Sequence, residues 1–211
     1  MSKIQEIAAA IESGKTKEVG PLVQEALDEG VAPLEILNVG MIDTMKAVGE
    51  KFQRDEVFVV EMLVAARAMK KGVDVLRPHL VGDDAAFLGK VIIGTVEGDL
   101  HDIGKNLVAM MIESAGFEVN DLGVDVKAST FVETLEADEE ISIVCCSALL
   151  TTTLPALKAT VEALNASSAR SRVKIIIGGA PVRQELVEEF GADAYAPDAA
   201  SAAEVAKGLA N

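Results

Sequence analysis

The sequence predicts an α/β protein in two parts, a four-helix bundle followed by a five-stranded parallel sheet with helices on both faces. In the first 78 residues, apolar positions recur at helical spacing. From residue 90 onward, short apolar runs alternate five times with helical segments, as in doubly wound sheets. The stretch between them contains Gly82-Asp83-Asp84 and has the composition of a linker. We therefore expect a helical domain at 1–78, a linker at 79–89 and an α/β domain at 90–211.

The four helices of the first half have recognisable ends. Ser2 and Gln5 have the spacing of a capping box, and Gly14 is placed to close the helix that they begin. The other three are expected from Thr16 to just before Gly30, from Pro33 onward, and from about Phe58 to Leu76. Short connections between them favour an antiparallel bundle.

In the second half the strands are expected at Val91–Val96, Glu118–Leu122, Ile141–Ser147, Val173–Ile177 and Ala192–Tyr195. Helices are expected at Ile103–Ala115, Ala128–Glu136, Leu154–Asn165, Pro181–Phe190 and Ala200–Leu209. Repeated strand–helix units indicate a Rossmann-like sheet of the flavodoxin type, with strand order 2-1-3-4-5. Ligands of such sheets bind beyond the carboxyl ends of strands 1 and 3.

Two loops at this position carry the residues of chemical interest. The first strand is followed by Asp99–Gly104, which contains His101, one of only two histidines in the chain. The third strand is followed by a loop rich in hydroxyl groups, Ser147–Thr153. Asp99 could accept the Nδ1–H of His101 and leave Nε2 free for a metal. The alternative, a loop histidine that only hydrogen-bonds nearby acids, stays open from spacing alone.

Several familiar ligands do not suit these loops. The glycines Gly94, Gly98 and Gly104 have the wrong spacing for a dinucleotide or a P-loop. A flavin phosphate would meet acidic side chains, and the third strand lacks the terminal aspartate of a phosphoacceptor domain. The histidines His79 and His101 are too far apart in sequence to indicate a zinc site. A neutral or weakly charged ligand remains, with or without a metal that takes one imidazole.

Composition narrows the partners. The formal net charge is −15 and aromatic residues make up 3% of the chain, so nucleic acid and anionic membrane surfaces are not expected partners. The chain has no apolar run near the ~20 residues of a membrane span and no signal-peptide pattern at its start. Cys145 and Cys146 are expected to be buried and reduced, in a cytoplasmic protein. Lys105 is expected to be exposed at the start of its helix.

The loop residues give the chain a resemblance to the cobalamin-binding domain of corrinoid methyltransferase systems. That family carries Asp-x-His-x-x-Gly, then Ser-x-Leu, then Gly-Gly, which here are Asp99–Gly104, Ser147–Leu149 and Gly178-Gly179. The helical half is similar to the family's cap domain. The family usually has Phe-Leu-Pro where this chain has Phe58-Val59-Val60, a departure that bears on the cap.

The resemblance implies a role for each of these residues. His101 would be the lower axial ligand of the cobalt in a cobalamin, either methylcobalamin or hydroxocobalamin, and Asp99 and Thr153 would form a relay with it. The nucleotide tail of the cofactor would be displaced and buried along the sheet. The implied cofactor-binding residues are Asp99, His101, Asp102, Ile103, Gly104, Ser147, Leu149, Thr151, Gly178 and Gly179, with Phe58 and Met62 from the cap.

The function implied by the resemblance is that of a methyl carrier without a catalytic site of its own. It would accept a methyl group on Co(I) from a substrate-specific methyltransferase and pass it, as methyl-Co(III), to a second, methyl-accepting methyltransferase. A reductive activase is a further expected partner. Two alternatives are a cobalamin-binding subunit of an adenosylcobalamin mutase and a cobalamin-sensing regulatory module. The helical half argues against the first, and the acidic N-terminal half against a DNA-binding regulator.

Overall fold

The computed structural model describes residues 2–54, 56–80 and 87–210, and these form two compact units. One comprises residues 1–87 with 113–116, and the other comprises 88–112 with 117–211. Most of the expected linker, residues 81–86, lies outside the described residues. Each unit is described by itself below.

The helical unit is built from four helical rods. Its elements are α1 (Lys3–Glu12), α2 (Thr16–Asp28), α3 (Pro33–Glu35), the π-helical segment Ile36–Ile42, α4 (Asp43–Gln53), α5 (Val59–Leu76) and a 3-10 turn at Arg77–His79. The expected capping box is present, because the Ser2 hydroxyl accepts from Gln5 N–H and the Gln5 side chain accepts from Ser2 N–H. The rod that begins at Pro33 runs from α3 through the π-helical segment into α4.

A close approach of helices fixes the middle of this bundle. A Cβ atom on Gly72 of α5 would lie 2.5 Å from the Met41 methyl group and 2.9 Å from a Val19 methyl group. Only glycine lets α5 pack this tightly on α2 and on the π-helical segment. Around this point the core is aliphatic, with Ile7, Ile11, Val23, Ile36, Leu37 and Leu76 almost fully buried.

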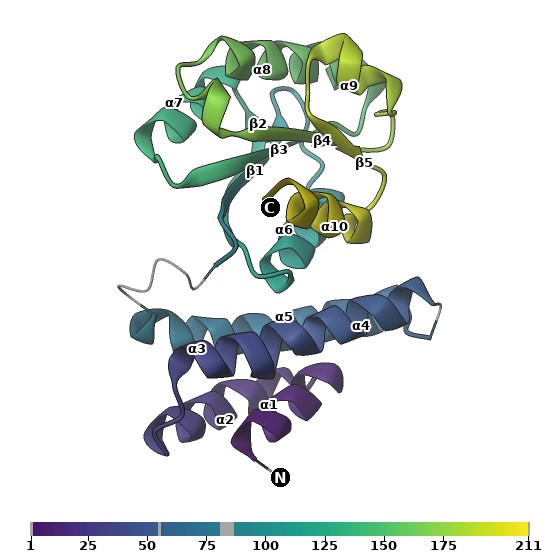
Figure 1. Cartoon of the computed structure of the whole chain (residues 1–211). Coiled ribbons are helices and arrows are strands. Elements are labelled where there is room, and N and C mark those ends of the chain that lie inside the picture. Colours follow the sequence, from purple (N-terminus) through teal and green to yellow (C-terminus); the bar gives the residue numbers. More distant parts are fainter. Residues whose placement is uncertain (1, 55, 81–86, 211) are drawn as a thin grey trace. The chain divides into compact units, whose positions relative to one another are not determined.

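The second unit is a five-stranded parallel sheet with the expected order β2-β1-β3-β4-β5. Its strands are β1 (Lys90–Val96), β2 (Glu118–Val126), β3 (Ile141–Ser147), β4 (Lys174–Gly178) and β5 (Ala194–Ala196). Its helices are α6 (Ile103–Ser114), α7 (Ala128–Ala137), α8 (Leu154–Ala166), α9 (Glu185–Phe190) and α10 (Ala199–Ala210), with 3-10 turns at Thr151–Thr153 and Arg170–Arg172. Figure 1 shows α7, α8 and α9 on one face of the sheet and α6 and α10 on the other.

Two element boundaries differ from the sequence expectation by more than two residues. The ninth helix begins at Glu185 rather than Pro181, because the chain after β4 first makes a turn in which Val182 N–H bonds to Gly179 C=O. The second strand continues past Leu122 to Val126, because its irregular pairing with β1 is kept through two register shifts. The fold class itself is as predicted.

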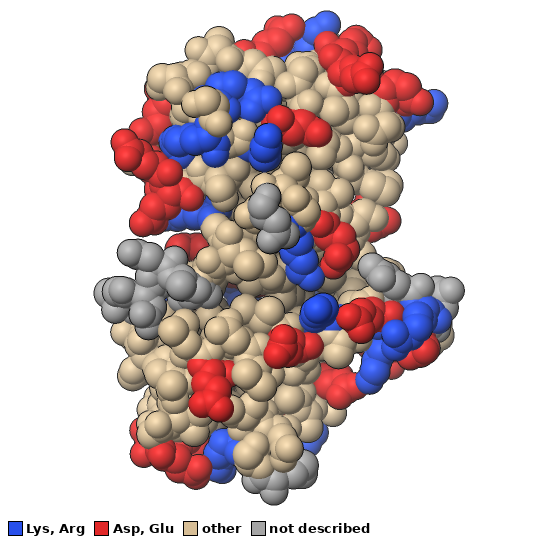
Figure 2. Space-filling model, in the orientation of Figure 1, with Lys and Arg blue, Asp and Glu red and all other residues tan. Residues whose placement is uncertain are grey.

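Charge is spread over the surface in both signs. On the face shown in Figure 2, lysine and arginine side chains are interspersed with aspartate and glutamate on each unit. Among the described residues, no helix is both long and apolar enough to cross a membrane.

Candidate functional site

The imidazole of His101 lies in the loop that joins β1 to α6. Its Nδ1 is 2.7 Å from Asp99 Oδ1, and its backbone N–H donates to the same oxygen at 3.1 Å. The His101 side chain is 48% exposed, whereas the Asp99 side chain is fully buried. The ring is therefore held from behind at Nδ1, as the sequence suggested, while a large part of it stays accessible.

Asp99 is the polar centre of the site. Its second carboxylate oxygen accepts from Leu149 N–H at 2.7 Å and from the Thr153 hydroxyl at 2.8 Å. Burial alone would raise the pKa of this carboxyl group, but the hydrogen bonds from Leu149, His101 and Thr153 outweigh burial and hold the pKa well below the usual aspartate range. Because an ionised carboxylate can only accept, this contact places a hydrogen on His101 Nδ1 and leaves Nε2 as the ring nitrogen that can bind a metal.

A further hydrogen bond behind the loop, from Thr95, was not predicted from the sequence. Thr95, in β1, is fully buried, and its hydroxyl donates to the His101 carbonyl oxygen at 2.8 Å. The same hydroxyl lies 3.2 Å from the Ser147 hydroxyl at the end of β3. A hydroxyl residue inside the otherwise apolar run Val91–Val96 was the available signal. Ser147 thus supports the histidine loop through Thr95.

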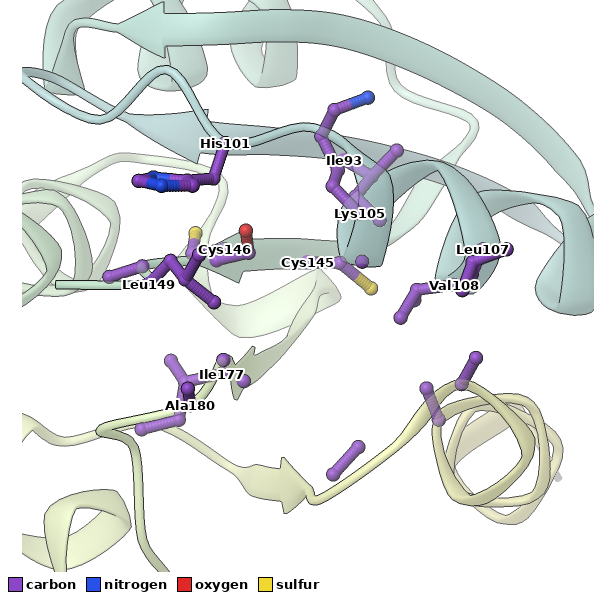
Figure 3. Close-up of a pocket in the computed structure, with 18 of the residues that line it drawn as sticks. Ile93, His101, Lys105, Leu107, Val108, Cys145, Cys146, Leu149, Ile177 and Ala180 are labelled. Atoms are coloured by element: carbon purple, nitrogen blue, oxygen red, sulfur yellow. The ribbon is translucent and has the colours of Figure 1, made fainter.

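A cavity of about 570 Å³ opens beside His101 (Figure 3). It lies against β1 and the carboxyl-terminal parts of β3, β4 and β5, and it is flanked by α6 and α10. Its inner wall is apolar, with Ile93, Val108, Cys145, Ile176 and Ala202 among the lining residues. Burial raises the pKa of Cys145 to about 12, so the thiol is neutral there. The cavity can take an apolar, ring-sized group.

Three glycines border the cavity for different reasons. Gly179 has φ +120°, and a Cβ atom there would lie 1.9 Å from the Ala148 carbonyl oxygen, so the fold itself requires glycine. A Cβ atom on Gly178 would lie 3.1 Å from the Ala196 carbonyl oxygen. A Cβ atom on Gly104 would meet no protein atom within 4 Å. Gly104 therefore leaves space that the protein does not use.

The structure brings most of the expected site residues together. Those that line the cavity are His101, Asp102, Ile103, Gly104, Ser147, Leu149, Gly178 and Gly179. Asp99 and Thr153 lie behind the imidazole, and Thr151 is exposed in the adjacent 3-10 turn. The other two expected residues belong to the helical unit, where Phe58 is 75% exposed and Met62 is 3% exposed. Their contact with a cofactor stays a prediction.

One expectation at the site was wrong. Lys105 is not exposed at the start of α6; its side chain is 1% exposed. Its ammonium group donates to the side chains of Asn106 and Asp121. The partner Asp121 comes from β2, sixteen residues further along the chain, and such a long-range pair could not be seen in the local sequence.

This donor set suits a corrinoid. The corrin ring surrounds cobalt with four nitrogens, so the protein need supply one axial donor, and His101 offers one free imidazole nitrogen. The neighbouring cavity has a largely apolar lining from strands and helices, and it is bordered by the unused space at Gly104. Both the single imidazole and the cavity therefore fit the cofactor expected from the sequence.

Comparisons with known proteins agree with this geometry. The B12 binding domain family matches residues 89–206, and a second family of the same description matches residues 3–77. A dimethylamine corrinoid protein of Methanosarcina acetivorans is 41% identical over 206 residues, which cover 98% of this chain and 96% of that protein.

Two solved structures share the fold. A cobalamin-binding protein from Desulfitobacterium hafniense is 31% identical with a TM-score of 0.74, and the match covers 98% of each chain. A chain of the methanol:cobalamin methyltransferase complex of Methanosarcina barkeri is 28% identical with a TM-score of 0.86, over 99% of this chain and 79% of that one. The chain therefore belongs to the corrinoid proteins, a family built on the B12 binding domain.

Proposed function

We propose that this protein is a cobalamin-dependent methyl carrier, which receives a methyl group from one methyltransferase and delivers it to another. The observation that carries the proposal is the His101 imidazole, held through Nδ1 by the buried Asp99 and exposed beside an apolar cavity. Relatives named as dimethylamine corrinoid protein and as part of a methanol:cobalamin methyltransferase complex support a role in methyl transfer.

Within this proposal His101 Nε2 would hold the cobalt of the bound corrinoid. The corrinoid, when bound, supplies a cobalt centre that can take up and release a methyl group. Asp99 holds the imidazole in one tautomer and orientation through its 2.7 Å contact with Nδ1. The Thr153 hydroxyl in turn holds Asp99, to which it donates at 2.8 Å. The hydrogen bond that His101 Nδ1–H donates to Asp99 makes the ring a stronger electron donor toward a metal, and the Thr95 hydroxyl holds the backbone carbonyl group of the same residue.

The cavity is the proposed site of the cofactor's nucleotide tail. Its walls come from α6, α10 and four strands, so the tail base would lie among aliphatic side chains and Cys145. Gly104 leaves room at the entrance, and Leu149, Gly178 and Gly179 border it. Burial of an aromatic base here would contribute much of the binding free energy.

The helical unit is proposed to shelter the opposite face of the corrin. Phe58 and its neighbours Val59 and Val60 form an exposed apolar group at the start of α5, which an apolar partner could cover. Phe58 and Met62 are the proposed contacts. The methyl donor is bound by a separate methyltransferase, and a reductive activase is the proposed source of electrons when the cobalt becomes oxidised.

Reconstitution tests the proposal in two steps. The protein is incubated with hydroxocobalamin, and the absorption spectrum of the desalted sample is compared with that of His101→Ala. We expect a stoichiometric coloured complex whose axial-ligand bands change in the variant. The complex is then offered dimethylamine or methanol together with candidate methyltransferases, and the methyl group on the cofactor is measured. A protein that binds no cobalamin, or binds adenosylcobalamin alone, would contradict the proposal.

A further inference from the structure

The end of the edge strand β2 departs from regular pairing next to the histidine loop. Along β1 the partners of Ile93, Gly94 and Val96 are Asp121, Gly123 and Val126. Between each consecutive pair of these partners, β2 contains one residue more than β1 does. Each extra residue forms a bulge, so β2 has two bulges here. Bulges of this kind bend a strand and redirect its side chains, and they are frequent beside functional sites.

The second bulge contains an unusual backbone conformation. Asp125 has φ +54°, and among the described residues it is the one non-glycine residue with a positive φ. An aspartate adopts this left-handed conformation only at some cost, and it persists where neighbouring contacts impose it. The contacts of Asp125 therefore indicate what the strained conformation is for.

The side chain and the backbone N–H of Asp125 each form a hydrogen bond with the loop that carries the imidazole. Its Oδ1 accepts from Gly98 N–H at 2.7 Å, and its backbone N–H donates to the Asp99 carbonyl oxygen at 3.0 Å. Asp99 in turn holds His101 Nδ1. Asp125 thus fixes the backbone of the residue that orients the ring.

The first bulge fixes the other end of the same loop. Asp121 accepts from Gly123 N–H at 2.9 Å with one oxygen and pairs with the buried Lys105 ammonium through the other. Lys105 also donates to Asn106 Oδ1 at 2.6 Å, and both residues lie in the first turn of α6. The pair therefore holds the backbone that follows His101.

We propose that the double-bulged segment Asp121–Asp125 is a clamp that sets the position of the His101 imidazole, with Asp125 and Asp121 as positioning residues. This inference rests on the proposed axial role of His101. Asp125 holds the loop before the imidazole and Asp121 holds it after. Neither side chain touches the ring, so the clamp acts through Asp99 and through the start of α6.

Three variants of Asp125 separate positioning from simple support of the sheet. Asp125→Gly relieves the backbone strain but removes the acceptor for Gly98 N–H, and Asp125→Ala removes the acceptor and keeps the strain. Asp125→Asn keeps an acceptor and tolerates the left-handed conformation. Asp138→Gly is a control away from the site, because Asp138 accepts a backbone N–H bond from Glu140 just before β3; this variant also removes the ion pair of Asp138 with Lys90, which the unfolding measurement takes into account.

Each protein is prepared with ¹⁵N-histidine, reconstituted with unlabelled cobalamin and reduced to the cobalt(II) state, and the twofold splitting in its electron paramagnetic resonance spectrum gives the fraction with an axial histidine nitrogen. Thermal unfolding is measured on the same samples. We expect the uncoordinated fraction to rise at least threefold in Asp125→Gly and Asp125→Ala, to return to the wild-type value in Asp125→Asn and to stay unchanged in Asp138→Gly. If Asp125→Gly does not fold, Asp121→Asn is read in the same way.

The outcomes distinguish this inference from the function on which it rests. A wild-type spectrum without imidazole nitrogen would overturn the axial role of His101. A wild-type spectrum with it, and an equal imidazole fraction in folded Asp125→Gly and Asp125→Ala, would overturn the clamp alone. A loss in Asp125→Gly that Asp125→Asn does not restore would equally contradict positioning by the acceptor oxygen.

Discussion

The two faces of the sheet differ in how they are filled. Beneath α7, α8 and α9, large side chains such as Phe131, Leu157 and Val161 are fully buried and pack into a continuous core. Beneath α6 and α10, glycines and alanines border a cavity of about 570 Å³. Adjacent residues of β3 differ in this respect, since Cys146 belongs to the filled core and also borders the cavity, whereas Cys145 borders the cavity and is not part of that core.

The filled face therefore contributes mainly to the stability of the cofactor-free protein, and the face with the cavity contributes mainly to the binding of a ligand. A filled face gains free energy from burial in the folded protein alone, whereas a face with a cavity gives up part of that energy until a ligand occupies it. Equivalent changes on the two faces should therefore have opposite signatures, in the stability of the cofactor-free protein on one face and in cofactor affinity on the other.

The largest effect is expected from truncating matched leucines. Leu157→Ala, on the filled face, should lower the free energy of unfolding by about 2–5 kcal/mol because it leaves a void in packed surroundings. Leu107→Ala, on the cavity wall, should cost roughly 1 kcal/mol or less but weaken cobalamin binding. Urea unfolding and cobalamin titration check both. Equal destabilisation by the two variants would remove the distinction between the faces.

A smaller effect, of opposite sign on the two faces, is expected from adding volume. Val161→Leu should destabilise the cofactor-free protein by about 1–3 kcal/mol, because the filled face has no room for another methylene group. Ala202→Leu should leave its stability unchanged or slightly higher, since the side chain can enter the cavity, and should lower cobalamin affinity at least tenfold. Undiminished affinity in Ala202→Leu would show that the cofactor does not use this cavity.

The Asp99 carboxylate behind the imidazole should make the free energy of unfolding depend on pH in the acid range. The pKa of Asp99 is lower in the folded protein than in the unfolded chain, so the unfolded chain takes up the proton first. Its contribution is present above the ordinary aspartate value of 3.8 and is lost as the pH falls below it. Asp99→Asn should cost about 2 kcal/mol at neutral pH and flatten this acid dependence. A variant with the wild-type acid profile would contradict the assignment.

The smallest effect on folding is expected at Gly104. Gly104→Ala meets no protein atom and lies in the first turn of α6, so the free energy of unfolding should change by less than about 1 kcal/mol. Cobalamin affinity should fall if the tail passes this point. Calorimetric titration of the variant measures it, and wild-type affinity would place the tail elsewhere.

Patterns within short segments allowed much of this molecule to be predicted. The strand Ile141–Ser147 has its expected bounds because its apolar run is continuous, and the strand order then brought His101 and the Ser147 loop together. The hydrogen bond from His101 to Asp99 also followed from spacing.

The rest depends on contacts between distant segments. The burial of Lys105 follows from its pair with Asp121, and the second bulge of β2 is held by hydrogen bonds between Asp125 and the histidine loop. Taken alone, Lys105, Asp121 and Asp125 are residue types that are common at exposed positions, so none of them indicated these contacts. The place of the cavity was expected from the strand order, but its full lining could not be predicted, since its walls come from six separate elements.

The central claim is that the His101 imidazole binds the cobalt of the corrinoid from below. The direct measurement is electron paramagnetic resonance of the cobalt(II) protein prepared with ¹⁵N-histidine, with His79→Gln as the control for the other histidine. We predict that the threefold nitrogen splitting of the unlabelled protein becomes twofold on labelling, in the wild type and in His79→Gln alike, and that it disappears in His101→Ala. A splitting that labelling leaves unchanged would assign the axial nitrogen to the cofactor's own base and contradict the account.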